Sequence, residues 1–276
     1  MPGLYIVATP IGNLGDIGAR AAATLASADL IAAEDTRVTA KLLAHLGIKV
    51  PMTPYHDHSD ERTRSALVAR MEREIVVLVS DAGTPLISDP GYKLVRDARA
   101  AGRHVTTLPG PCAAIAAITL SGLPSDRFLF AGFLPNKAKA RADAIAEFSG
   151  LRATLVFYES GPRLAAALGA LADGLGNREA AVAREISKLY EQCVTGTLTE
   201  LAARYEYAPP KGEIVIVVGP PGAEIAEEAD EATLDTALRE AMADKPVAQA
   251  AKAVAKRFGL DRHDVYARAL ALKERA

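Results

Sequence analysis

Short apolar runs rich in β-branched residues alternate with Ala-, Leu- and Arg-rich stretches of helical period along most of this 276-residue chain. Such alternation predicts an α/β architecture with mainly parallel strand pairing. The expected strands are Leu4–Ala8, Leu30–Ala33, Ile75–Ser80, His104–Leu108, Phe128–Phe133, Ala153–Tyr158, Ala180–Glu185 and Glu213–Val218. The expected helices include Ile17–Ala26, Val38–Leu46, Ser59–Arg73, Ala138–Phe148 and Arg163–Leu171.

Two breaks divide the pattern. A Pro/Gly-opened helix near residues 109–125 separates two sets of α/β units, and the stretch GPPGAEIAEEADEA at 219–232 resembles a linker. We therefore expect an N-terminal α/β domain over residues 1–115, a C-terminal α/β domain over 116–220 and a small basic helical tail over 233–276. In the second domain, Leu189–Thr195 and Gly212–Val218 are expected to be antiparallel neighbours.

The tail changes composition, with eight Lys and Arg against three Asp and Glu over residues 245–276. Its pattern predicts a helix, Gly259 as a C-cap, and a second helix capped by Asp261, which together resemble a helix-turn-helix unit. Two interpretations stay open. The tail is either an amphipathic hairpin packed on the main body or a nucleic-acid contact made by Lys252, Lys256, Arg257 and Arg262.

Several classes of protein are disfavoured. No run of about twenty apolar residues predicts a membrane span. The N-terminus begins directly with a strand and lacks the basic region of a secretory signal. Cys112 and Cys193 are far apart in sequence, so we expect two reduced thiols in a cytoplasmic protein. The net charge of −2 does not by itself indicate nucleic-acid binding, although a local patch can escape such a sum.

The most informative loop is SDAGTPLISDPG, residues 80–91, which follows a buried apolar run. An ordinary strand-to-helix connection needs only about two to six residues. The loop exposes backbone and small polar side chains, holds no Lys, and carries Asp81 and Asp89, whose charges would repel phosphate. It therefore favours a neutral or zwitterionic ligand with an adenosine-like ring and ribose hydroxyls. Asp89 and Pro90 are expected to begin the next helix.

Other loops at predicted strand ends add candidates. TPIGNLGDI at 9–17 lacks both the GxGxxG spacing and a following GK[ST], so a dinucleotide site or P-loop is poorly supported, and a plain tight turn stays open. The stretch AEDTR brings Glu34, Asp35 and Arg37 together, which suits substrate binding or proton handling, although Asp35 could simply cap a helix.

Histidines do not predict a metal site. His56 and His58 flank Asp57, but ligands two residues apart need an extended backbone, and no further Cys/His cluster supplies the remaining ligands. We expect no metal.

Taken together, the segments LYIVATPIGNLGDI, AEDTR, HDH, SDAGTPLISDPG, PGPCAAIAAITLSGLPSDRF, GFLP, YES, RL, ARE and KGE resemble one family in order and spacing. It is the ribosomal RNA small-subunit methyltransferase I family, within the tetrapyrrole-methylase-like (class III) S-adenosylmethionine-dependent methyltransferases. The resemblance covers residues 4 to about 218, and the basic tail is consistent with it.

The resemblance implies two α/β domains with a cofactor cleft between them, a homodimer, and S-adenosylmethionine bound in the cleft. It implies 2′-O-methylation of a cytidine ribose in the decoding region of small-subunit ribosomal RNA, which would be the partner. The implied cofactor-binding residues are Pro10, Ile11, Gly12, Asn13, Ser80, Asp81, Ala82, Gly83, Thr84, Pro85, Ile87, Ser88, Pro109, Gly110, Pro111, Cys112 and Ala113, with Tyr158, Lys211, Gly212 and Glu213 nearby.

Reasoning on the mechanism gives candidates rather than an assignment. A ribose hydroxyl needs a base near it, and the candidates are Glu34, Asp35, Glu159 and Glu185. Candidates to hold RNA phosphates are Arg37, Arg163, Arg184 and Lys188. Val38 replaces a His of the family pattern AEDTRHT, and Gly161 and Pro162 replace the Thr-His of YESTHRL. If those family residues did essential chemistry, this chain would lack it.

Two other functions stay open at this point. The same fold methylates tetrapyrroles, so the substrate could be a tetrapyrrole or another small molecule. A non-catalytic RNA-binding protein is the second alternative, which the intact SDAGTPLISDPG loop disfavours.

Overall fold

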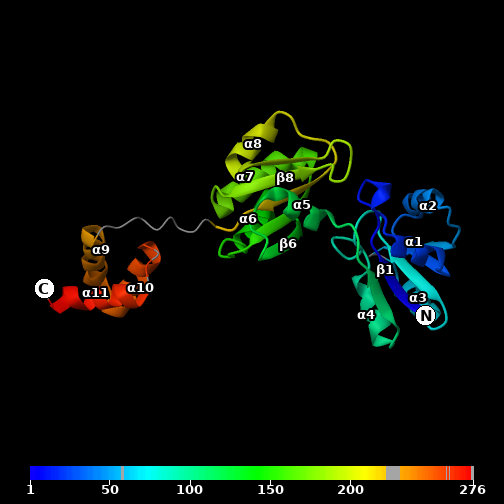
Figure 1. The fold of residues 1–276 in the computed structure, drawn as a ribbon, viewed down its shortest axis with the longest axis horizontal. Coiled ribbons are helices and arrows are strands. Elements are labelled where there is room, and N and C mark those ends of the chain that lie inside the picture. Colours follow the sequence, from blue (N-terminus) through cyan, green and yellow to red (C-terminus); the bar gives the residue numbers. More distant parts are fainter. Residues whose placement is uncertain (57–58, 222–230, 259, 261, 275–276) are drawn as a thin grey trace. The chain divides into compact units, whose positions relative to one another are not determined.

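Residues 1–220 and 221–276 form two compact units in this computed structural model, which describes residues 1–56, 59–221, 231–258, 260 and 262–274. The side chains of residues 231–232, 256–257, 262 and 274 also lie outside the description. The first unit contains two five-stranded sheets (Figure 1). The predicted boundary at 115/116 within this unit stays a prediction.

The first sheet is entirely parallel, with strand order β3-β2-β4-β1-β5. Its strands are β1 (Gly3–Val7), β2 (Leu30–Ala33), β3 (Met52–Pro54), β4 (Ile75–Val79) and β5 (Val105–Leu108). The alternation of side chains along β4 sends Val76 and Leu78 to one face and Val77 and Val79 to the other, and all four are buried. Both faces must therefore be covered, as is usual for a parallel sheet.

Helices cover the two faces of this sheet in pairs. The helices α1 (Ala19–Ala26) and α2 (Thr36–His45) supply residues to the core on one face, and α3 (Glu61–Arg70) and α4 (Tyr92–Ala100) to the core on the other. A short 3-10 helix, η1 (Leu14–Asp16), follows β1. All five parallel strands end on the same side of the sheet, so the loops that follow them gather at one edge.

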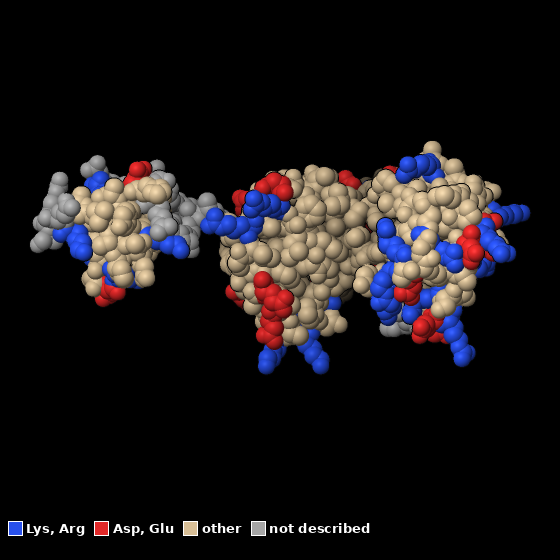
Figure 2. Space-filling model, turned by 90° about the horizontal axis from the view of Figure 1, so that it is seen from below, with Lys and Arg blue, Asp and Glu red and all other residues tan. Residues whose placement is uncertain are grey.

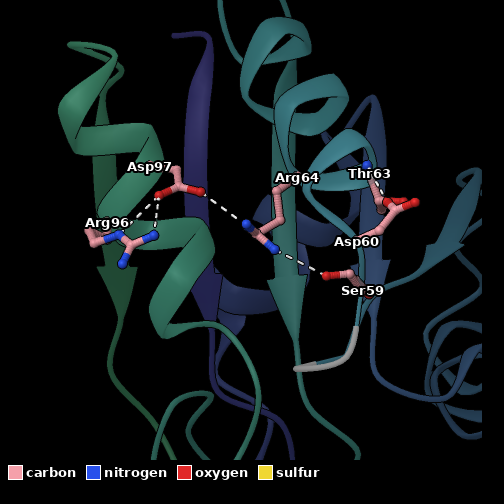
Figure 3. Close-up of polar contacts among 6 residues, drawn as sticks. All are labelled: Ser59, Asp60, Thr63, Arg64, Arg96 and Asp97. Carbon is pink, nitrogen blue, oxygen red and sulfur yellow. Dashed lines mark hydrogen bonds and ion pairs between the residues drawn. The ribbon is translucent and has the colours of Figure 1, made fainter.

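A charged network holds α3 beside α4 (Figure 3). Arg64 donates through Nε to Oδ2 of Asp97 at 3.1 Å and through Nη1 to the Ser59 carbonyl at 3.1 Å. Arg96 bonds the other oxygen of Asp97 at 3.0 Å. Hydrogen bonds from Arg64 and then Arg96 hold the pKa of Asp97 below its usual range. Asp60 caps α3 by accepting from the Thr63 amide at 2.8 Å.

The second sheet has the order β6-β7-β10-β8-β9. Its strands are β6 (Phe128–Phe133), β7 (Thr154–Ser160), β8 (Glu179–Arg184), β9 (Gln192–Thr197) and β10 (Glu213–Val218). Only the β6–β7 pair is parallel, so the expectation of mainly parallel pairing is wrong for this sheet. The expectation that residues 189–195 and 212–218 are antiparallel neighbours is also wrong, because β8 lies between β9 and β10 and is antiparallel to both.

One face of the second sheet packs on α6 (Ala138–Ala146), α7 (Leu164–Leu175) and α8 (Leu198–Glu206), and the other on α5 (Ala113–Ser121). The turn η2 (Gly161–Arg163) leads from β7 into α7. The strand β3 and the helix α8 are absent from the sequence-based expectations. The strand β3 has only three residues, whereas α8 carries a Thr197–Glu200 capping box that could have indicated its start.

The second unit consists of α9 (Glu231–Asp244), α10 (Val247–Phe258) and α11 (Arg262–Glu274) around a core that includes Leu238, Val254 and Phe258. Two of these helices agree with the predicted tail, whereas α9 begins at the end of the segment expected to be a linker. The predicted caps Gly259 and Asp261 lie outside the described residues. Within the described part of the chain, no helix has the length and apolar character needed to cross a membrane.

Candidate active site

A pocket of about 260 Å³ lies where the loops after the parallel strands of the first sheet meet one end of the second sheet. Both walls belong to the first compact unit. Its lining residues are Ile11, Glu34, Asp81, Ala82, Gly83, Thr84, Ile87, Ser88, Asp89, Cys112, Ala113, Phe133, Tyr158, Glu159, Glu185, Ile186, Lys188, Glu213, Ile214 and Val215.

The pocket is acidic. Six of its lining residues are Asp or Glu, and Lys188 is the only cation among them. Lys188 is itself paired, because its Nζ lies 3.1 Å from Oε1 of Glu185. This excess of negative charge favours a cationic or zwitterionic ligand and disfavours phosphate. Apolar groups such as those of Ile11 and Val215 line the same space and suit the rings or methylenes of such a ligand.

Two loops of the first sheet are joined at the pocket. The Thr9 amide donates to the Gly83 carbonyl at 2.8 Å, and the Gly83 amide donates back to the Thr9 carbonyl at 3.0 Å. Gly83 has φ +82°, a conformation that is costly for a residue with a Cβ. The Thr84 hydroxyl then donates to the Pro111 carbonyl at 2.9 Å, which adds the loop after β5. Gly83 in the SDAGTP segment is thus required because of its backbone conformation.

The same loop holds two strained residues. Leu86 and Ser88 both have positive φ, +76° and +62°, although neither is glycine. Such conformations persist only where the surrounding structure enforces them, and they concentrate at functional sites. Here they flank Ile87, which lines the pocket with 36% of its surface exposed. The loop is therefore longer than a simple connection because its extra residues form one wall of the pocket.

The loops after β2 and β4 share their acidic groups. The Asp35 amide donates to Oδ1 of Asp81 at 3.0 Å, and the Asp81 amide donates to Oε2 of Glu34 at 3.3 Å. Asp35 itself caps α2 by accepting from the Arg37 amide at 2.8 Å and pairs with the Arg37 side chain at 2.6 Å. These contacts with Arg37 hold the pKa of Asp35 at about 2, which makes it a weak base.

Glu159 is the most deeply buried acid of the pocket, with 2% of its surface exposed. Its Oε1 accepts from the Ser160 amide at 2.8 Å and pairs with Nε of Arg163 at 3.1 Å. Its Oε2 is buried and has no hydrogen-bond partner among the described residues. A buried carboxylate oxygen without a partner is costly unless a ligand donates to it, so Glu159 fits a bound donor group.

Tyr158 forms the aromatic part of the wall. Its hydroxyl accepts from the Ala114 amide at 3.2 Å, and its ring meets Phe130 and Phe133 edge to face at centroid distances of 4.8 and 5.6 Å. Burial raises the pKa of Tyr158, with the nearby Cys112 as the next cause, so the phenol stays protonated.

Asp89 is a pocket residue that the sequence reasoning missed. The sequence predicts that Asp89 and Pro90 begin a helix, but α4 begins only at Tyr92, and Asp89 lines the pocket instead. Burial raises its pKa to about 6, opposed by a hydrogen bond with Ser80 and supported by the charges of Glu34, Asp81 and Glu213. The sequence did carry one signal for Asp89, because it is the second Asp in a loop that is longer than a strand-to-helix connection needs. Phe133, Ile186, Ile214 and Val215 were missed too, because apolar strand residues look like core.

The loop from 185 to 191 reaches from the second sheet to the first. Ser187 donates to Asp16, and the side chain of Lys188 covers Gly12 so closely that a Cβ there would lie 2.4 Å from Lys188 Cε. The backbone is strained here as well, with φ +51° at Glu185 and +67° at Ser187. Gly12 thus contacts the covering loop rather than the pocket.

The structure brings most predicted residues to one place and moves others away. Predicted residues that line the pocket are Ile11, Glu34, Asp81, Ala82, Gly83, Thr84, Ile87, Ser88, Cys112, Ala113, Tyr158, Glu159, Glu185, Lys188 and Glu213. Predicted residues outside its lining are Pro10, Gly12, Asn13, Asp35, Ser80, Pro85, Pro109, Gly110, Pro111 and Gly212.

The predicted RNA-contacting cations are scattered. Arg37 pairs with Asp35, and Arg163 pairs with Glu159 and donates to the Leu134 carbonyl. Arg184 lines a different pocket, as does Lys211, which was expected near the cofactor. Lys252 is exposed on α10, while the side chains of Lys256, Arg257 and Arg262 lie outside the described residues.

Metal ligands are not grouped in the described part of the chain, where no three His, Cys, Asp or Glu side chains are placed to hold an ion. Asp57 and His58 of the HDH motif lie outside the described residues.

Comparisons with known proteins identify the class first. The model of the Tetrapyrrole (Corrin/Porphyrin) Methylases matches residues 3–202, and the fold agrees. The chain aligns with uroporphyrin-III-C-methyltransferase from Thermus thermophilus at TM-score 0.56 and 22% identity, covering 79% of this chain and 94% of that one. It aligns with diphthine synthase at TM-score 0.60 and 16% identity, covering 78% and 89%. Fold and pocket thus define a methylase of the tetrapyrrole methylase class.

Curated relatives narrow this to one family. Proteins named ribosomal RNA small subunit methyltransferase I are 57% identical in Erythrobacter litoralis, over 99% of this chain and 96% of theirs, and 45% identical in Escherichia coli O157:H7, over 97% and 94%. The model described as RsmI C-terminal HTH domain matches residues 228–273. The chain belongs to the ribosomal RNA small subunit methyltransferase I family, and it is a methyltransferase.

Proposed function

We propose that this protein transfers a methyl group from S-adenosylmethionine to the ribose 2′-oxygen of a cytidine in the decoding region of small-subunit ribosomal RNA. The observation that carries the proposal is the acidic pocket, lined by Glu34, Asp81 and Asp89 on one wall and Glu159, Glu185 and Glu213 on the other. Together with family membership, it joins a site for a cationic methyl donor to an RNA substrate.

The pocket fits S-adenosylmethionine by its chemistry. That cofactor carries a sulfonium and an ammonium, both of which are stabilised by carboxylates, and ribose hydroxyls that can donate to them. The unpartnered Oε2 of Glu159 supplies one buried acceptor. The apolar surfaces of Ile11, Ala82 and Val215 suit an adenine ring. A P-loop type of phosphate site would need the opposite charge.

When bound, S-adenosylmethionine supplies an electrophilic methyl group. The chain's residues would then hold the ribose hydroxyl in line with the carbon–sulfur bond, which accounts for much of the rate. One of the pocket's carboxylates would accept the hydroxyl proton when the methyl group is transferred, and S-adenosylhomocysteine would be the second product. Glu34 and Glu185 are half-buried at the pocket and are the favoured bases, with Glu159 behind them.

Asp35 stays a weaker candidate for the base, because its ion pair with Arg37 and its helix-capping bond already use its oxygens. Replacing Glu34 or Glu185 by Gln, one at a time, should reduce turnover at least tenfold if that residue is the base, since general-base catalysis contributes about 10²–10⁴-fold. Asp35→Asn serves as the comparison. Full turnover in a Gln variant removes that residue from the mechanism.

The setting of the reaction is also part of the proposal. The protein acts in the cytoplasm as a homodimer, on the assembled small subunit rather than on free RNA, and the second unit contacts the RNA through basic residues such as Lys252. Figure 2 shows that Lys and Arg are abundant over the part of the molecule built on the first sheet. Exposed cations on α3 and α4 include Arg62, Lys93 and Arg99. These exposed cations are compatible with a large polyanionic substrate.

Methyl transfer from labelled S-adenosylmethionine to small ribosomal subunits lacking the modification is the direct test. We expect 2′-O-methylcytidine after digestion of the RNA and nucleoside analysis. Naked small-subunit RNA is the parallel substrate and reports whether the assembled particle is needed. Binding of S-adenosylmethionine without transfer to either substrate would redirect the assignment to another acceptor.

A further inference from the structure

A second pocket lies near the same end of the second sheet as the acidic one, against α8. It is lined by Arg184, Gln192, Arg204, Tyr205, Ala208, Pro210 and Lys211, which come from the adjoining ends of β8 and β9, from α8 and from the loop before β10. We call it the basic pocket. Its lining includes three cationic side chains and no carboxylate. This composition is the reverse of that of the acidic pocket.

The three cations of the basic pocket are not neutralised. Some arginines of the first unit are paired with acids, as Arg64 is with Asp97. In contrast, Arg184, Arg204 and Lys211 have no ion-pair partner among the described residues, and the only side-chain bond of Arg184 is from its Nε to the neutral Oε1 of Gln192 at 2.9 Å. Clustered cations repel one another, so a pocket that gathers them is stabilised by an anion.

Tyr205 provides a second and independent observation. Only 7% of its surface is exposed, and its hydroxyl is buried without a hydrogen-bond partner among the described residues. Burial raises the pKa of this phenol, while the charges of Arg204 and Arg184 and the approach of the Arg204 side chain as a donor act in the opposite direction. Arginine only donates hydrogen bonds, so the proton of the phenol itself has no acceptor. The protonated hydroxyl therefore keeps an unused donor beside three cations, and a buried donor without an acceptor costs free energy.

The two pockets are joined through consecutive residues. Side chains alternate along a strand, so Arg184 shares the face of the buried Val182 in β8, and the next residue, Glu185, lines the acidic pocket. Lys211, in the loop before β10, lines the basic pocket, and Glu213, at the start of β10, lines the acidic one. Gly212 lies between them, and a Cβ there would be 2.7 Å from Oε1 of Glu185. A ligand that passes this end of the sheet meets both.

We propose that the basic pocket binds a phosphate group, and that this phosphate belongs to the RNA strand whose ribose reaches the acidic pocket. The second half of this inference rests on the proposed function. The acidic pocket repels phosphates, so the strand needs a separate anchor for its backbone close to the site of methyl transfer. Arg184, Arg204 and Lys211 supply the charge, and Tyr205 supplies a donor for a phosphate oxygen.

The test compares single variants of the full-length protein. Arg204→Gln and Lys211→Gln remove one charge each from exposed positions, and Tyr205→Phe removes only the hydroxyl. Arg152→Gln is the matched control, because Arg152 is an exposed arginine in the loop before β7 with no ion pair among the described residues. RNA affinity is measured from about 50 to 200 mM salt, and S-adenosylmethionine affinity is measured in parallel.

We expect Arg204→Gln and Lys211→Gln to weaken RNA binding about fivefold to tenfold and to lower the slope of log affinity against log salt by about 0.7 each. The KM for the RNA substrate should rise accordingly, while the affinity for S-adenosylmethionine stays unchanged. Tyr205→Phe should weaken RNA binding without changing the slope, because it removes no charge. Wild-type affinity and slope in both charge variants would overturn the proposal.

Titration with inorganic phosphate separates the two sources of the anion. If phosphate binds the wild type and not Arg204→Gln, while RNA binding is unaffected by the substitution, the pocket takes a free anion and the RNA assignment is wrong. If the wild type binds no phosphate and RNA affinity is unaffected, the basic pocket is not an anion site. If the wild type methylates no small-subunit RNA, the proposed function fails, and the phosphate titration still decides the first half of the inference.

Discussion

The hydroxyl of Ser187, in the loop after β8, donates a hydrogen bond to Oδ2 of Asp16, in the turn after β1. This contact joins the second sheet to the first at the mouth of the acidic pocket. Both partners lie in the first compact unit, and the backbone of Ser187 is held at φ +67° to make the contact. We call the loop from 185 to 191 the clasp, because it lines the acidic pocket through Glu185, Ile186 and Lys188 and bonds to the turn after β1.

The clasp gives the first prediction. Ser187→Ala removes the hydrogen bond and should weaken S-adenosylmethionine binding about twofold to tenfold, since a hydrogen bond contributes about 0.5–1.5 kcal/mol net. Isothermal titration calorimetry measures the effect. Ser149→Ala is the control, because Ser149 caps only its own helix end by donating to Ala146. Equal affinities in the two variants would remove the clasp's role in binding.

A second prediction concerns Gly83. Gly83→Ala should lower the free energy of unfolding by about 1 kcal/mol or more, because φ +82° is unfavourable for alanine. The same change should weaken cofactor binding, since the backbone bonds between Gly83 and Thr9 shape the pocket. Urea unfolding and calorimetry report the two effects separately.

Two glycines serve as controls for that experiment. Gly47 has φ +68° with open space around it, so Gly47→Ala should cost stability and leave cofactor binding intact. Gly18 also has open space, and its φ of −69° suits alanine, so Gly18→Ala should be neutral or slightly stabilising. A Gly83→Ala protein that binds the cofactor as well as Gly47→Ala does would show that the bridge to Thr9 is not needed for the pocket.

These residues also show how much the sequence could predict. The alternating pattern indicated both sheets and most helices, because buried strands in both sheets keep a strong apolar signal, as at Val76–Val79 and Ile214–Val218. It did not indicate strand direction in the second sheet. A strand buried on both faces has the same pattern whether its neighbour is parallel or antiparallel.

The sequence predicts the site residues that lie in loops of unusual composition, and it does not predict those that lie in apolar strands. SDAGTPLISDPG was informative because its length and glycine content exceed what a turn needs. Phe133 and Val215 have the sequence signature of core residues, and only the folded chain shows that they line a pocket. Lys211 precedes β10 and lines the basic pocket, whereas Glu213, two residues on, lines the acidic one. The loop sequence does not encode that directly.

Asp89 predicts a dependence of stability on pH. Its pKa is about 6 in the folded protein against an ordinary value of 3.8. Between these values the folded state keeps a proton that the unfolded chain has lost, so the free energy of unfolding falls as the pH rises from about 4 to 6. The loss is about 1–2 kcal/mol after allowance for partial exposure of the carboxyl. Asp89→Asn should remove this loss and raise the melting temperature at pH 7.

The same group should make cofactor binding pH-dependent in the opposite sense. A cationic ligand favours the ionised carboxylate, so the affinity for S-adenosylmethionine should increase as the pH rises through 6. Asp89→Asn should bind more weakly at pH 7 and lose most of that increase. Dissociation constants from pH 5 to 8 test this, and a wild-type affinity that is flat across the range would exclude Asp89 from the cofactor site.

The last prediction separates the two compact units. A chain ending at Pro221 keeps the whole first unit, in which both pockets lie, so its affinity for S-adenosylmethionine should match that of the full chain within about twofold. Its RNA affinity should fall about tenfold or more near 100 mM salt, with a smaller salt slope, because the cations of the second unit are lost. Lys252→Gln in the full chain should reproduce a part of that change. RNA binding by the shortened chain with unchanged affinity and slope would instead mean that α9, α10 and α11 serve another purpose, and that the cations of the first unit are sufficient to hold the substrate.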